Sequence, residues 1–97
     1  MRVNGLEWDD INLEHIGKHN LSPEEIEDAC FGRHYAFRVK YKRMAIFGQT
    51  SGGKYIKVIL EQRHGNTYRP ITAFGMKREE QKKYKSIMGS GVKINGK

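Results

Sequence analysis

The sequence predicts an α+β fold in which two N-terminal helices precede a four-stranded antiparallel sheet and a C-terminal helix. Three observations predict it. Two helix start signals lie within residues 1–32, residues 35–74 show the alternation typical of strands, and residues 76–88 return to helical spacing. The chain has 97 residues and no internal repeat, which fits a single domain over residues 1–97.

Both N-terminal helices are predicted from their capping residues. Asp9 or Asp10 can cap a first helix that runs to about His19. The second helix starts at residues 22–25, SPEE, where a serine cap, a proline and a glutamate form a capping box, and it should stop near Gly32. The helical side chains expected to face the core are Ile11, Ile16, Ile26, Ala29 and Cys30.

The four strands are predicted over residues 35–41, 44–47, 55–62 and 67–74. Turn signals at residues 50–53 and 64–66 indicate hairpins. Pro70 lies in the last strand and favours an edge position or a bulge there. A helix over residues 76–88 follows, and residues 89–97 are expected to form a flexible tail.

Composition excludes several classes of protein. Hydrophobic residues make up 37% and aromatic residues 10% of the chain, which is too much for a disordered chain. No stretch approaches the ~20 apolar residues of a membrane span, and the first residues lack the apolar run of a signal peptide. The single cysteine, Cys30, excludes an internal disulfide framework. We therefore expect a cytoplasmic protein.

The charge is distributed unevenly along the chain. Residues 1–32 contain eight acidic and two basic side chains, for a net charge of −6. Residues 33–97 contain sixteen basic and three acidic side chains, for a net charge of +13. A basic excess that falls on predicted strands indicates a polyanionic partner such as nucleic acid, although a solvated basic surface has the same pattern.

The histidines and the cysteine are not expected to form a metal or nucleophilic site. His15 and His19 have the i,i+4 spacing of a helical metal site but lack the HExxH pattern, and His34 and His64 lie in predicted turns. Cys30 occupies an apolar helical position, where an inert buried thiol is expected. No metal or other cofactor is expected.

A set of charged side chains shares the outer face of the predicted sheet. Lys57, Glu61 and Arg63 alternate with apolar residues along one strand. A two-residue loop in the next hairpin would pair Gln62 with Arg69, whereas a three-residue loop would set Glu61 opposite Arg69 on the outer face. These side chains could simply form a cross-strand ion pair on a solvated sheet, worth under about 1 kcal/mol.

A series of short motifs also spans most of the chain. They are Leu6-Glu7-Trp8-Asp9, Asn12, Lys18-His19, Ser22-x-x-Glu25-Ile26, Ala29, Gly48-Gln49-Thr50-x-x-Gly53-Lys54, Arg63, Arg69-x-Ile71-Thr72-Ala73, Lys77-Arg78-Glu79 and Tyr84. In this order and spacing the chain resembles the BrnT family of type II toxin–antitoxin ribonucleases. The resemblance implies a compact fold similar to that of RelE-type toxins.

The resemblance implies that the chain cleaves RNA without a metal. In that reaction the 2′-hydroxyl attacks the adjacent phosphate, helped by a base, by cations and by an acid. Arg63 and Arg69 would hold the phosphate, because a guanidinium can bind two of its oxygens at once. Glu61 would act as the base or orient an arginine. Lys18 and His19 would supply the acid and a substrate contact.

Lys57, Lys77 and Arg78 are the candidate contacts to flanking RNA phosphates. The family commonly has Ile-Ser-Ala-Arg where residues 71–74 here are ITAF, so Phe74 replaces an arginine and one candidate phosphate ligand. The resemblance also implies inhibition of translation, with RNA cut on or off the ribosome. It implies neutralisation by a BrnA-like ribbon-helix-helix antitoxin in a hetero-oligomer.

A non-catalytic module that binds RNA or an acidic partner protein is the alternative function. Such a module needs only a basic surface with exposed aromatic side chains, for which the candidates are Tyr35, Tyr41 and Tyr68. An enzyme instead needs both arginines in one concave site with Lys18 or His19 nearby.

Overall fold

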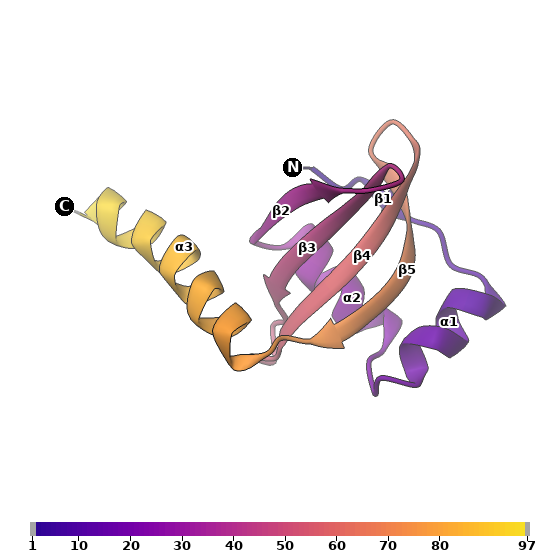
Figure 1. Cartoon of the computed structure of the whole chain (residues 1–97), viewed down its shortest axis with the longest axis horizontal. Helices are drawn as coiled ribbons and strands as arrows, with labels where there is room; N and C mark the ends of the chain where they lie inside the picture. The colour runs from indigo at the N-terminus through magenta and orange to yellow at the C-terminus, as the bar shows by residue number, and fades with distance from the viewer. Residues whose placement is uncertain (1, 97) are drawn as a thin grey trace.

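The structure is a computed structural model that describes the backbone of residues 2–96 and the side chains of residues 2–89. Its elements in chain order are β1 (Gly5–Leu6), α1 (Asp10–Gly17), α2 (Pro23–Phe31), β2 (His34–Val39), β3 (Arg43–Gln49), β4 (Tyr55–His64), β5 (Thr67–Gly75) and α3 (Arg78–Gly96). Helices α1 and α2 lie on one side of the sheet, and α3 extends away from it (Figure 1).

The sheet has five strands in the order β1-β5-β4-β3-β2. Strands β2 to β5 pair antiparallel as predicted, but β1 pairs parallel to β5, with Gly5 opposite Thr67 and Leu6 opposite Tyr68. The prediction of four antiparallel strands was therefore wrong in strand number and in the direction of one pair. A two-residue strand is too short to show the alternation by which a strand is recognised in sequence.

Side-chain capping starts both N-terminal helices as predicted. The Asn12 N–H donates to the Asp9 carboxylate (2.9 Å), and the Asp9 N–H donates to the Asn12 amide oxygen (2.9 Å). Ser22 caps α2 in the same way, accepting from the Glu25 N–H (3.2 Å). Reciprocal bonds of this kind satisfy donors that the first helical turn would otherwise leave unpaired.

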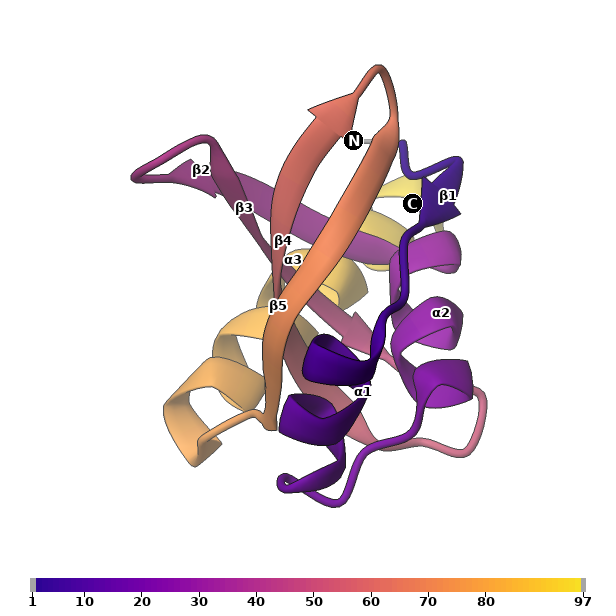
Figure 2. The same cartoon turned by 90° about the vertical axis from the view of Figure 1, so that its right-hand side faces the viewer.

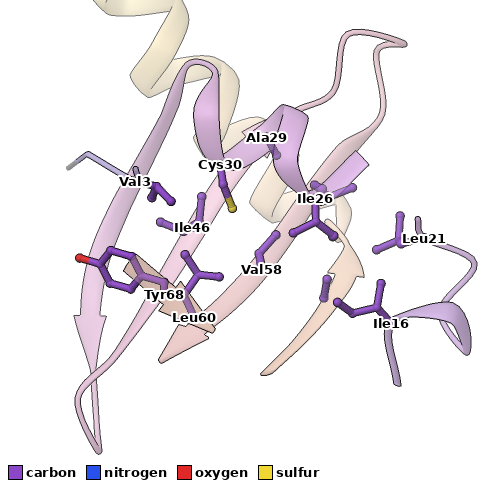
Figure 3. Close-up of a cluster of buried hydrophobic side chains, with 12 residues drawn as sticks. Val3, Ile16, Leu21, Ile26, Ala29, Cys30, Ile46, Val58, Leu60 and Tyr68 are labelled. Atoms are coloured by element: carbon purple, nitrogen blue, oxygen red, sulfur yellow. The ribbon is translucent and has the colours of Figure 1, made fainter. Parts of the chain in front are cut away.

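The main core fills the space between the sheet and helices α1 and α2, as Figure 3 shows. Ile16, Ile26 and Leu60 are fully buried there. Ile11 was predicted to face the core but is 73% exposed. The buried face of α1 runs instead through Asn12 and Ile16, which lie one helical turn apart.

Helix α3 packs on the other face of the sheet, where Met76 and Tyr84 join Phe47 in a second, smaller cluster. The predicted end of this helix before Gly89 was wrong, because the helix continues to the end of the described chain. A glycine costs a helix about 1 kcal/mol without forbidding it. The flexible tail expected over residues 89–97 falls almost entirely on residues whose side chains lie outside the described part of the structure. Within the described chain, no helix is long and apolar enough to cross a lipid bilayer.

Candidate functional site

The register of the β4–β5 hairpin decides which charged side chains meet. Glu61 lies opposite Arg69, Gln62 opposite Tyr68 and His64 opposite Thr67, so a bulge leaves Arg63 without a partner on β5. The hairpin has the two-residue loop, residues 65–66. The bulge nevertheless sets Glu61 opposite Arg69, the pairing that was expected for a three-residue loop. A second register shift next to Pro70 confirms the predicted bulge.

Six side chains gather near the loop end of this hairpin, and we call them the arginine cluster: Glu7, Asp9, Glu61, Arg63, His64 and Arg69. Arg63 Nε lies 3.2 Å from a Glu7 carboxylate oxygen, and Arg63 Nη1 lies 3.8 Å from Glu61 Oε1. The other Glu7 oxygen lies 3.7 Å from His64 Nε2. Glu7 therefore links an arginine to a histidine.

Arg69 is held more firmly than Arg63. Its Nε and Nη2 donate to the two oxygens of Asp9 at 2.9 and 3.3 Å, and 22% of its side chain is exposed, against 48% for Arg63. The hydrogen bond from Arg69 is the main reason that the pKa of Asp9 is lowered. The same bond raises the pKa of Arg69. Arg69 therefore binds the cap of α1 in this structure.

Asn12 fixes the acidic side of the arginine cluster. Only 1% exposed, it donates from Nδ2 to the carbonyl oxygens of Glu7 and Pro70, both at 3.0 Å. These bonds connect the segment before α1 to strand β5. They hold Glu7 and Asp9 beside the arginines that they pair with.

Lys18 and His19 lie at the other end of α1, away from the arginine cluster. The His19 ring meets the edge of Phe74, with ring centroids 5.1 Å apart. Phe74 is separated from Arg69 by roughly 15 Å along the strand. Within the described residues, neither Lys18 nor His19 has a hydrogen bond or ion pair with the arginine cluster. The structure thus divides the predicted catalytic residues into two groups.

Lys57 belongs to the group around Phe74. Its ammonium lies 5.4 Å from the Phe74 ring centroid and 2.7 Å from a carboxylate oxygen of Glu80. The hydrogen bond from Lys57 lowers the pKa of Glu80, and so does the bond from the Lys77 backbone N–H. Lys77 and Arg78, the other predicted RNA contacts, are exposed at the start of α3.

Three members of the arginine cluster were not among the predicted site residues: Glu7, Asp9 and His64. Asp9 was predicted only as a helix cap, and its partner Arg69 lies 60 positions away along the chain. The motif Leu6-Glu7-Trp8-Asp9 carried the only sequence signal for the two acids. The parallel pairing of β1 with β5 brings them to the hairpin.

Cys30 and His34 lie outside the arginine cluster. Cys30 is buried as predicted, and burial raises the pKa of its thiol to about 12. His34 lies at the start of β2 and not in the predicted turn. In the described part of the chain, no group of three or more His, Cys, Asp or Glu side chains is placed to hold a metal ion.

The fold and the arginine cluster define a small α+β protein whose cationic and acidic side chains meet near the loop end of a hairpin with two register shifts. The solved structure of the ribonuclease toxin BrnT from Brucella abortus is similar, with a TM-score of 0.63. The two chains are 21% identical, and the match covers 76% of this chain and 97% of that one. No family model and no curated protein matches the sequence. The chain therefore has a fold similar to that of BrnT, the family that its sequence resembles.

Proposed function

We propose that this chain is a ribonuclease toxin that cuts RNA without a metal and thereby inhibits translation. One observation carries the proposal: two arginines, three carboxylates and a histidine lie together near the loop end of the β4–β5 hairpin, on a fold similar to that of BrnT. Cleavage by the neighbouring 2′-hydroxyl needs these kinds of groups, namely cations for the phosphate, a base and an acid.

We assign the reaction centre to Arg63. Because its ion pairs are long and its side chain is half exposed, a phosphodiester can replace Glu7 as its partner. Arg69 is tied to Asp9 and would bind a second phosphate oxygen only by sharing its donors. Surface ion pairs such as these are worth about 0–1 kcal/mol, so the exchange costs little.

Glu61 and His64 carry out the proton transfers, because Glu61 lies beside Arg63 and His64 lies beside Glu7. Glu61 takes the proton of the 2′-hydroxyl as O2′ bonds to phosphorus, and the bond from phosphorus to the 5′ oxygen breaks. His64 donates a proton to that leaving oxygen, which leaves a 2′,3′-cyclic phosphate. His64 takes the role expected of His19, because His64 shares Glu7 with Arg63. Lys18, His19 and Lys57 are then contacts for the flanking strand.

The second candidate function is a non-catalytic module that binds RNA or an acidic protein. Both arginines are already paired with carboxylates, and Phe74 lies between His19 and Lys57 where the resemblance leads us to expect an arginine. These contacts are compatible with a chain that has kept its fold and lost its chemistry.

Cleavage of a labelled RNA by purified variants tests the choice between the two functions. Arg63→Ala should lower the cleavage rate by about 10²–10³. Arg2→Ala removes the same charge from an exposed position and should leave the rate unchanged. Phe74→Arg adds a cation beside His19 and Lys57, roughly 15 Å from Arg69 along β5, and should strengthen RNA binding more than it changes the cleavage rate. Equal rates for the wild type and Arg63→Ala would overturn the site, and binding without cleavage by every variant would establish the second function.

We also propose a partner for the toxin. A ribbon-helix-helix antitoxin would neutralise this chain in a hetero-oligomer, with an acidic segment over the basic half of the molecule. Such a segment is favoured by the net charge of +13 on residues 33–97.

A further inference from the structure

The hairpin between β2 and β3 carries positive charge that nothing in the described structure neutralises. Residues 29–60 contain no aspartate or glutamate. Each of Lys54, Lys57, Arg63 and Arg69 has an acidic partner, whereas Lys40, Lys42 and Arg43 form no ion pair within the described residues. Figure 2 shows this hairpin projecting from the sheet on the side away from α1 and α2.

Aromatic side chains alternate with these cations. Tyr41 lies between Lys40 and Lys42 and is 81% exposed, and Phe37 is 45% exposed. The Phe37 ring continues a row of nearly parallel rings, because it lies 5.6 Å from Phe47 with planes 20° apart. We call Phe37, Lys40, Tyr41, Lys42 and Arg43 the basic hairpin.

The backbone of the basic hairpin is unfavourable for two of its residues. Tyr41 and Lys42 have φ of +64° and +58°, in the left-handed region that glycine and asparagine adopt most easily. A tight turn of this shape is more stable with those residues. Bulky side chains kept at strained positions indicate a role beyond folding.

The basic hairpin continues the arginine cluster across the sheet. Arg43 on β3 lies opposite Glu61 on β4, and Glu61 lies opposite Arg69 on β5. Neighbouring strands are about 4.8 Å apart, so one nucleic-acid strand can contact both groups. The side chains of Phe37, Arg43 and Glu61 belong to the sheet face that α3 also uses.

We propose that the basic hairpin binds single-stranded RNA and guides it to the arginine cluster. Lys40, Lys42 and Arg43 bind phosphates, and Tyr41 and Phe37 stack on bases. This combination of cations and aromatic rings is how proteins bind single strands without reading their sequence. An acidic protein would also satisfy the cations and pack on the rings, so binding of an acidic peptide is measured beside binding of RNA. The choice of RNA as the ligand rests on the proposed function.

Fluorescence anisotropy with a 2′-O-methylated RNA of about 10 nucleotides tests this directly. Such an RNA cannot be cut, so binding is measured apart from cleavage. Tyr41→Asn should weaken binding at least about fivefold, as expected for the loss of one stacked base. The same variant should unfold at a higher temperature than the wild type, since asparagine suits the left-handed backbone. Weaker binding by a more stable protein cannot be attributed to misfolding.

Two double lysine variants distinguish direct contact between the basic hairpin and RNA from attraction by the overall positive charge of the protein. Lys40→Gln/Lys42→Gln should weaken binding and reduce the slope of log affinity against log salt by about 1.4. Lys82→Gln/Lys83→Gln removes the same charge from exposed positions on α3 and should have a smaller effect. Equal loss by both pairs, or no binding of the RNA by the wild type, would overturn the proposal.

Two further outcomes are distinguishable. If Tyr41→Asn and the Lys40/Lys42 pair bind the RNA like the wild type but lose a polyglutamate peptide, the basic hairpin serves an acidic protein and the proposal is wrong. If the wild type binds RNA through the basic hairpin but cleaves none, the ribonuclease function fails while the RNA-binding surface stands.

Discussion

At the scale of single residues, the side chains that hold the fold also build the candidate site. Asp9 caps α1 and receives two hydrogen bonds from Arg69. Asn12 completes the cap and bonds to the backbone of β5. The same contacts that attach α1 to the sheet therefore set the position of the arginines. We expect a substitution here to change both stability and the proposed cleavage activity.

Replacing the buried Asn12 tests how much the contacts between α1 and the sheet contribute to stability. Asn12→Ala removes the Nδ2 donor that binds the carbonyl oxygens of Glu7 and Pro70. We expect a loss of about 2–4 kcal/mol in the free energy of unfolding, measured by urea denaturation. Asn4→Ala, at an exposed position, is the control and should change it by less than about 0.5 kcal/mol. A loss that is equally small for Asn12→Ala would show that the bonds contribute nothing.

At the scale of elements, close contact between α2 and β3 depends on Gly48. A Cβ at this position would lie 3.0 Å from both the Cβ and the carbonyl oxygen of Ala29. Gly48→Ala should therefore push α2 away from the sheet and destabilise the protein by about 1–3 kcal/mol. Thermal unfolding measures the effect. Gly75→Ala is the matched control in β5, because its Cβ would meet no atom within 4 Å.

The sequence predicted most elements because their signals are local. The capping residues Asp9 and Ser22 and the alternation along β4 each act within a few positions. The fifth strand was missed because Gly5–Leu6 is defined only by its partner on β5. The extension of α3 was missed because a glycine disfavours a helix without ending it.

The candidate site was predicted only in part, because its geometry depends on contacts between distant segments. Glu61, Arg63 and Arg69 were predicted, and they meet. Their grouping depends on a bulge at Arg63 that alternation alone cannot show. Lys18 and His19 were assigned to the same centre from the resemblance, but they follow the C-terminal end of α1, where the His19 ring meets Phe74.

At the scale of the whole molecule, carboxylates in the acidic half connect the helices to the basic sheet. Glu25 pairs with Lys54 at 2.7 Å, and Asp28 accepts two hydrogen bonds from Ser51. Hydrogen bonds from these partners lower the pKa of both carboxyls. Asp9 at the start of α1 pairs with Arg69 on β5, and Glu80 on α3 pairs with Lys57 on β4. Each of the three helices is thus attached through an acidic side chain to the sheet or to the loop before β4.

This arrangement predicts a protein that acid destabilises. A carboxyl whose pKa is lower in the folded state stabilises the fold above its unfolded pKa, here about 3.8 for Asp and 4.5 for Glu. That stability is lost as the pH falls through the lowered values. The melting temperature should therefore fall between about pH 5 and pH 2. Glu25→Gln should make the melting temperature differ less between neutral and acid pH. Glu79→Gln, at an exposed position on α3, should leave that difference unchanged. A melting temperature that rises on acidification would contradict this.

The central claim is that the chain cuts RNA through the 2′-hydroxyl without a metal, and the chemical ends of the products test it most directly. Purified wild-type protein should cleave a 5′-labelled RNA in the presence of excess EDTA. The 5′ fragment should end in a 2′,3′-cyclic phosphate, which acid opens and phosphatase then removes. An RNA with 2′-deoxyribose at the cleaved position should resist. Cleavage that stops with EDTA, or a product ending in a free 3′-hydroxyl, would contradict the account.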